Sequence, residues 1–138
     1  MVVCAELLHK GAKEPIAFFN VHTDHQGELA RIAEANQICR SLYASPFGFV
    51  LVGDFNAYPN SRCISVVTST AETLGTKELT SHIKGTFHAF TGNVGEAKID
   101  YIFTNLESEE NCGYAVPDDD SEGCYYSDHN ALCAYVEV

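Results

Sequence analysis

Short apolar runs separated by polar turns dominate the chain, and their lengths predict strands. Residues 2–8 and 15–22 flank the polar stretch HKGAKE, a pattern that predicts a β-hairpin. The apolar run at 49–52 is long enough for a buried strand and too short for a helix. Residues 98–104, KIDYIFT, predict a further strand, and residues 131–138 predict the last one.

One segment instead repeats its apolar residues at steps of three or four, which is the spacing of a helix. It runs from about residue 25 to residue 44, with Thr23 or Asp24 as its N-terminal cap. A second, shorter helix is predicted after Pro59-Asn60-Ser61, and residues 70–85 are predicted to be loop with at most one helical turn. The apolar stripe of the first helix consists of Leu29, Ile32, Ala35, Cys39 and Leu42.

These elements predict one layered domain. The chain has 138 residues, of which 46% are hydrophobic and 20% charged, values that suit a single globular domain. Weaker alternation at 86–90 and 113–116 adds two short strands. Because strands outnumber helices and separate the two helices, we expect an α/β or α+β fold in which helices pack on a sheet.

Polar side chains gather where four of the predicted strands begin or end. A carboxylate and a carboxamide at the mouth of a buried strand are costly unless something uses them. Both are hard oxygen ligands of the kind that Mg²⁺ or Mn²⁺ prefers. A plain turn stays open as the alternative for GDFN, because Gly, Asp and Asn favour turns. The residues in question are His22 in NVHTDH, Asp54 and Asn56 in GDFN, Asp100 in KIDYIF, and Asp128 and His129 in SDH.

Asp100 is conspicuous because it lies in an otherwise apolar strand, between Ile99 and Tyr101. A carboxylate in that position needs a partner, and a histidine is a good candidate. An Asp–His pair is the unit used for general base catalysis, in which the acid orients the imidazole. We therefore predict that Asp100 and His129 are hydrogen-bonded and that the imidazole faces Asp54 and Asn56.

The excess of acidic residues limits which classes of partner the protein can bind. Eight basic and 19 acidic residues give a formal net charge of −11, which makes long duplex DNA a poor candidate, because phosphate binding draws on Lys and Arg. The acidic run at 118–120 is predicted to be a solvated loop, since it lacks the spacing of a calcium loop. No apolar run of membrane-spanning length and no signal-peptide pattern occurs, so cytoplasmic and secreted locations both stay open.

The six cysteines include no Cys-x-x-Cys pair, which argues against a zinc knuckle or a thioredoxin motif. Cys39 and Cys133 are expected to be buried as small hydrophobic residues. Cys112 and Cys124 flank one loop, and a disulfide between them in an oxidising compartment stays open.

NVHTDH, GDFNAYPNS, TFHAF, KIDYIF and SDHNAL, in this order and at these spacings, resemble the endonuclease/exonuclease/phosphatase superfamily. The Thr-Phe-His-x-Phe element is similar to bacterial members, many of unassigned substrate. The resemblance implies a divalent-metal-dependent phosphoesterase that needs Mg²⁺ or Mn²⁺ and hydrolyses a phosphomonoester or phosphodiester. It also implies half of a deoxyribonuclease-I-like four-layer β-sandwich, a mainly antiparallel sheet with two helices on one face.

The resemblance assigns roles to the motif residues. His22 would hydrogen-bond the scissile phosphate, and His129 would act as the base or phosphate-polarising group, oriented by Asp100. Asp54 and Asn56 would help to bind metal and to position water, and Asp128 would be a further metal ligand.

Substrate contacts are also implied for His22, Asn56 and His88, although a structural role for His88 within TFHAF is an equal alternative. The substrate stays open among nucleic acid, phosphoinositide, sphingomyelin-like lipid and small phosphate esters.

A complete member of this superfamily has about twice as much fold, so residues 1–138 are expected to be its second half. The first half normally supplies an Asn and a metal-binding Glu, which leaves the activity of this chain open. The alternative function is a catalytically inactive half-domain that serves as a binding or self-associating module. One apolar sheet face would then need a cover, which predicts a homo-oligomer or pairing with a missing N-terminal half.

Overall fold

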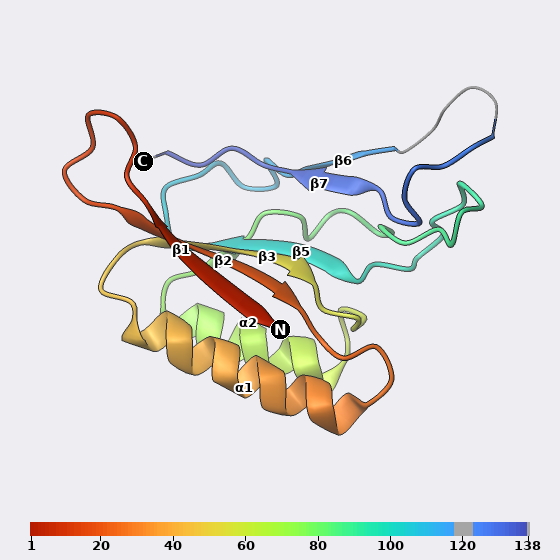
Figure 1. Cartoon of the computed structure of the whole chain (residues 1–138), viewed down its shortest axis with the longest axis horizontal. Helices are drawn as coiled ribbons and strands as arrows, with labels where there is room; N and C mark the ends of the chain where they lie inside the picture. The colour runs from red at the N-terminus through yellow and green to blue at the C-terminus, as the bar shows by residue number, and fades with distance from the viewer. Residues whose placement is uncertain (118–122, 138) are drawn as a thin grey trace.

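The computed structural model describes residues 1–117 and 123–137, which build a central five-stranded sheet (Figure 1). The strand order is β1-β2-β3-β5-β4. Neighbouring strands are antiparallel except for β2 and β3, which run parallel. The strands are β1 (Val2–Leu7), β2 (Ile16–His22), β3 (Phe49–Asp54), β4 (Lys77–Glu78) and β5 (Asp100–Thr104).

Both helices, α1 (Glu28–Ala44) and α2 (Arg62–Thr73), cover the same face of the sheet (Figure 1). Every second side chain of a strand points to this face, so the strands and helices share one continuous core. Ring pairs such as Phe55 and Tyr101, with centroids 5.5 Å apart, fill its centre. We call this the helix-covered face.

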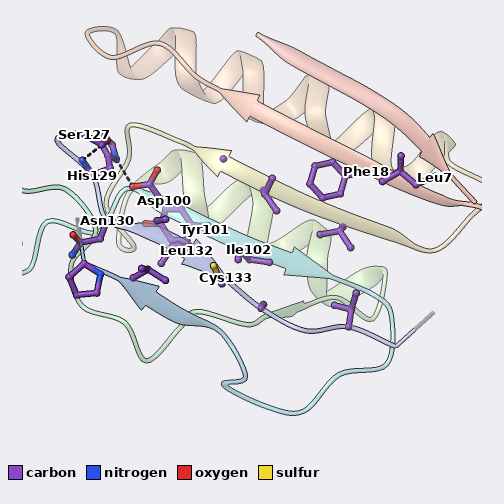
Figure 2. A pocket seen from close by; sticks show the side chains of 18 of the residues that line it. Leu7, Phe18, Asp100, Tyr101, Ile102, Ser127, His129, Asn130, Leu132 and Cys133 are labelled. Atoms are coloured by element: carbon purple, nitrogen blue, oxygen red, sulfur yellow. Dashed lines mark hydrogen bonds and ion pairs between the residues drawn. The ribbon is translucent and has the colours of Figure 1, made fainter. Parts of the chain in front are cut away.

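The opposite face carries a two-stranded antiparallel sheet made of β6 (Tyr114–Val116) and β7 (Ala131–Cys133). This small sheet lies over only part of the five strands (Figure 1). A cavity of about 910 Å³ remains between the two sheets, with apolar side chains along most of its wall (Figure 2). Of the core residues on this side, only Val50, Leu79 and Ile102 are buried. We call this the open face.

The predicted hairpin, the strands at 49–52 and 98–104, and the two helices are confirmed. The first helix begins later than expected, at Glu28, because Asp24 Oδ1 accepts hydrogen bonds from the N–H groups of Gln26 and Gly27 in a turn before it. Leu29 was wrongly assigned to the apolar stripe: its exposed fraction is 78%. Ala35, Cys39 and Leu42 are buried as predicted, and Ile38 is buried with them, so the predicted stripe is confirmed except in the first turn of the helix.

Other boundaries also differ. The second helix continues to Thr73, which accounts for the one helical turn allowed within 70–85, and β4 was not predicted. No strand forms at 86–90: Ala89 and Phe90 have φ values of 50° and 60°, which end the extended conformation after a single bridge between Phe87 and His129. The last predicted strand is reduced to β7.

The acidic run at 118–120 and residue 138 lie outside the described residues. Within residues 1–117 and 123–137 no helix has the length and hydrophobicity of a membrane span. The described chain contains no disulfide bond, and the Cys112 thiol lies 3.3 Å from the carbonyl oxygen of Tyr135.

Candidate functional site

Strand register places three of the predicted site residues in a row. His22 is the pairing partner of Asp54 across β2 and β3, and Asp54 is the partner of Asp100 across β3 and β5. Directly paired residues point to the same face of a sheet. All three side chains therefore lie at one end of the open face.

Gly53 allows the strands to approach closely enough for this row. Its φ is +142°, and a Cβ atom there would lie 1.9 Å from the carbonyl oxygen of Val21 on β2. A larger residue would clash with backbone rather than with a movable side chain, so it would push β2 away from β3. The distance between His22 and Asp54 therefore depends on a glycine at this position.

His129 lies over the row and joins its two carboxylates. Its Nδ1 is 2.7 Å from Asp100 Oδ2 (Figure 2), and its Nε2 is 4.0 Å from Asp54 Oδ2. Because Nδ1 is used by Asp100, Nε2 is the nitrogen that faces Asp54. The predicted Asp100–His129 hydrogen bond, with the imidazole facing Asp54, is confirmed.

Asp54 is the central acid of the site. Its Oδ2 lies 3.5 Å from His22 Nε2, and its Oδ1 accepts a 2.7 Å hydrogen bond from the Asn56 backbone N–H. Burial raises the pKa of Asp54 above the usual value, and the facing Asp100 carboxylate raises it further. The Asn56 N–H and the two imidazoles act in the opposite direction.

Asn56 is held by the loop that follows β2. Its side-chain Nδ2 donates to the carbonyl oxygen of Thr23 at 3.0 Å, and its φ of +45° turns the chain sharply after β3. Thr23 in turn donates its N–H to the Asp54 carbonyl (3.0 Å) and its hydroxyl to the Phe55 carbonyl. With Nδ2 occupied, Asn56 presents its Oδ1 oxygen as the group available to a ligand.

These side chains line a cleft of about 670 Å³. His22, Asp54, Asn56, Asp128 and His129 all line it, so the cleft brings together five of the predicted site residues. Asp128 Oδ1 lies 3.9 Å from His129 Nε2. His88 does not line the cleft: it is buried, its Nδ1 accepts from the Gly92 N–H, and its ring packs against Tyr125.

Solved structures with the same fold were found for nearly the whole chain. An endonuclease/exonuclease/phosphatase from Bacteroides vulgatus is 26% identical over 93% of this chain, with a TM-score of 0.69. A mannosyl-6-phosphatase from Bacteroides thetaiotaomicron is 22% identical over 86% of it, with a TM-score of 0.65. D. rerio TDP2, complexed with a single-strand DNA product, is 14% identical over 95%, with a TM-score of 0.70.

The fold is that of the endonuclease/exonuclease/phosphatase proteins. The chain spans 52%, 49% and 59% of these three structures, or about half of such a fold. No family model matches the sequence, and no curated protein matches it. The predicted resemblance and the predicted fold class are thus confirmed by structure.

Within this endonuclease/exonuclease/phosphatase fold, one threonine fixes the Asp100–His129 pair. Thr86 is fully buried, and its Oγ1 accepts hydrogen bonds from the N–H groups of Ile99 (3.1 Å) and Asp100 (3.2 Å). Its carbonyl oxygen accepts from the Asn130 N–H at 2.8 Å. Sequence reasoning gave Thr86 no role of its own, although it opens the TFHAF motif, because a threonine in a predicted strand carries no chemical signal.

Two further residues that sequence reasoning missed hold His129. The Phe87 ring packs edge-on against the imidazole, with centroids 5.0 Å apart. Ser127 Oγ accepts from the His129 N–H at 3.0 Å. The motif SDH could have suggested this contact, because Ser side chains often accept from the N–H two residues later.

The donor atoms fit a hard divalent cation. One oxygen each from Asp54 and Asp100 and one nitrogen from His129 lie within 4.8 Å of one another. The two carboxylate oxygens suit Mg²⁺ and Mn²⁺, whereas an imidazole nitrogen is a ligand more typical of Zn, Cu, Fe and Ni. This group differs from the predicted ligand set Asp54, Asn56 and Asp128, which stays a prediction.

Proposed function

We propose that this chain carries the hydrolytic site of a divalent-metal-dependent phosphoesterase. The observation that supports it best is the line formed by Asp100, His129, Asp54 and His22, in which each successive pair is 2.7 Å, 4.0 Å and 3.5 Å apart. Two imidazoles converge on one partly buried carboxylate, an arrangement suited to moving protons at a phosphate ester.

His129 and His22 would contact the substrate phosphate. Asp100 holds His129 so that Nε2 faces the cleft, where it can donate a proton to a phosphoryl oxygen or accept one. His22 is more exposed, on the other side of Asp54, and its Nε2 can hydrogen-bond another oxygen of the same group. Asp100 then acts as a positioning residue, because it reaches the substrate only through His129.

Asp54 is the candidate that activates water. Burial raises its pKa, which makes its carboxylate a stronger proton acceptor than an exposed aspartate. Asn56 fixes one Asp54 oxygen through its N–H and leaves the other facing the cleft. The bond formed would be water oxygen to phosphorus, with the proton of the water passing to Asp54. The bond broken would be phosphorus to the ester oxygen, which would leave with a proton donated by an imidazole of the cleft.

Asp54, Asn56 and Asp128 would hold the cation, as the resemblance implies. Bound there, Mg²⁺ or Mn²⁺ supplies positive charge against the charge that develops on the phosphoryl oxygens. The resemblance implies a further Glu ligand from the other half of the fold, so residues 1–138 on their own are expected to bind the cation with low affinity.

The cleft favours a small phosphate ester over a long nucleic acid. Its volume of about 670 Å³ lies in the range of small-molecule sites. Arg31 is the one Lys or Arg side chain among its described lining residues, whereas Glu28, Asp54 and Asp128 are acidic. Extended phosphate backbones need several cations along their path. The mannosyl-6-phosphatase with this fold is consistent with a sugar phosphate or a similarly small substrate.

The test is hydrolysis of chromogenic phosphomonoesters and phosphodiesters with Mn²⁺ or Mg²⁺ titrated. We expect a metal-dependent rate well below that of a complete family member, which His129→Ala lowers by about 10²–10⁴-fold. His82→Ala is the matched control, because His82 is exposed and lies outside the cleft. Equal rates for His129→Ala and the unmodified chain would refute the assignment.

The second candidate is an inactive half-domain that binds other protein surfaces. It is favoured by the open face, where a cavity of about 910 Å³ and partly exposed apolar side chains lack the cover that the helices give to the other side. In the same assay, a chain that is folded and shows no response to metal would support this candidate over the enzyme.

A further inference from the structure

Strand β1 is an edge of the five-stranded sheet that residues 1–117 and 123–137 form. It is the outermost strand in the order β1-β2-β3-β5-β4, and no other described strand pairs with its outer side. Five of its six residues are exposed, among them Val3 at 53% and Leu7 at 47%. Natural edge strands usually carry Lys, Pro or a bulge that prevents pairing, but VVCAEL has only one charge, Glu6.

The hydrogen bonds at the start of the strand show which backbone groups face outward. The Met1 N donates to the His22 carbonyl (2.7 Å) and the His22 N–H donates to the Met1 carbonyl (3.0 Å), so these two residues form a hydrogen-bonded pair. Such pairs alternate with non-bonded pairs along an antiparallel ladder. The N–H and C=O groups that face away from β2 are therefore those of Val2, Cys4 and Glu6.

We propose that β1 pairs with β1 of a second copy of this chain, antiparallel, about a two-fold axis at Cys4. In this register Cys4 faces the partner subunit's Cys4, and Val2 faces the partner subunit's Glu6. Every outward N–H and C=O group of both strands is then hydrogen-bonded. A shift of two residues in either direction leaves the outward groups of one residue per copy unpaired.

The side chains are compatible with this pairing. Val3, Ala5 and Leu7 lie on the open face, and Val3 would contact the partner subunit's Ala5 across the axis. Glu6 does not face its own equivalent, so like charges are separated. The two five-stranded sheets would become one continuous sheet, which removes both exposed edges.

The affinity is expected to be low. Pairing of two six-residue strands buries less surface than the roughly 1,200 Å² of stable interfaces, which points to a dissociation constant in the micromolar range or weaker. The net charge of −11 on each copy opposes association, so added salt should strengthen the dimer by screening that repulsion.

Sedimentation velocity across micromolar to millimolar concentrations tests the proposal. We expect a monomer–dimer equilibrium that shifts toward dimer with concentration and with salt. Cys4→Pro removes one outward N–H without affecting the bonds to β2, since proline is tolerated on an edge strand. It should be monomeric with an unchanged circular dichroism spectrum, whereas Cys4→Ser should dimerise as the unmodified chain does.

Cross-linking gives an independent measurement. A short bis-maleimide should join two chains through Cys4, because the equivalent Cα atoms would lie about 5.5 Å apart. The cross-linked dimer should still form in Cys124→Ser and should not form in Cys4→Ser. The Cys4→Ser variant is the control, because it retains Cys124, the other exposed thiol. A monomer at every concentration and salt level would overturn the proposal. So would a dimer that survives in folded Cys4→Pro.

Discussion

The two faces of the five-stranded sheet are built from the same strands, yet they are packed very differently. On the helix-covered face sixteen buried residues form one cluster, whereas three buried residues form the cluster on the open face. His22, Asp54 and Asp100 all point to the open face. Side chains alternate between the two faces along each strand. One set of positions therefore fills the core and stabilises the fold, and the other set carries the residues of the candidate site.

Two neighbouring phenylalanines of β2 give the sharpest contrast. Phe19 is 3% exposed and lies in the helix-covered core, whereas Phe18 lies on the open face and is only partly buried. Phe19→Ala should reduce the free energy of unfolding by about 3–5 kcal/mol. Phe18→Ala should cost no more than about 1.5 kcal/mol, because fewer atoms surround its ring.

Urea unfolding of both variants, fitted with a common m-value, measures this difference. Similar costs for Phe18→Ala and Phe19→Ala would mean that the open face is packed in solution as tightly as the other.

A smaller effect is expected at the polar end of the open face. Asp54 has a raised pKa in the folded protein, chiefly because of burial, so the folded chain holds that proton more tightly than the unfolded chain. The resulting stabilisation is complete below the unfolded pKa of about 3.9 and is lost as the pH rises through the folded pKa. Asp54→Asn should therefore stabilise the protein at neutral pH, by about 0.5–2 kcal/mol, while abolishing hydrolysis.

Thermal unfolding of Asp54→Asn between neutral and acidic pH checks the sign. The extra stability of Asp54→Asn over the unmodified chain should shrink as the pH falls. Asp24→Asn provides the opposite case, because hydrogen bonds from Gly27 and Gln26 lower the pKa of Asp24. The Asp24 carboxylate therefore stabilises the folded protein above its unfolded pKa, and this stabilisation is lost as the pH falls through its folded pKa. Asp24→Asn should consequently be less stable than the unmodified chain at neutral pH. A pH-independent gain for Asp54→Asn would exclude burial of its charge as the cause.

The smallest effect is expected at Val3, on the uncovered part of the open face. Val3→Thr should change the free energy of unfolding by less than about 0.5 kcal/mol when it is measured on dilute, monomeric protein. A loss above about 1 kcal/mol under those conditions would mean that Val3 is covered within a single chain.

The helix-covered face could be predicted from sequence because its signals are local. The apolar run at 49–52 and the alternation around Tyr101 identify strands without any knowledge of the fold. Leu29 was wrongly included in the apolar stripe, because periodicity alone cannot tell whether the first turn of a helix extends beyond the sheet that it packs on. The residues at 86–90 have a strand pattern that positive φ values at Ala89 and Phe90 override.

The site was predictable where a residue was chemically out of place. Asp100 in an apolar strand required a partner, and His129 provides it at 2.7 Å. Thr86 could not be found in this way, because its importance depends on two distant segments meeting at one hydroxyl and one carbonyl. Strands at 113–116 and 131–138 were predicted, but the partial cover that β6 and β7 give to the open face was not, since the pairing of two short strands leaves no local signal in the sequence.

The bonds made by Thr86 have a consequence for how this protein can change over evolution. Residues 98–100 and 128–130 are both fastened to the segment 86–88, through Thr86 and through the His88 N–H, which donates to the Asp128 carbonyl at 2.8 Å. Asp100 and His129 are therefore both held by a third segment of the chain, in addition to the contact of Ser127 with the His129 N–H. The exposed loop around Glu109 and Glu110, between β5 and β6, can therefore change in length or accept an engineered insertion while the acid and the imidazole stay in register.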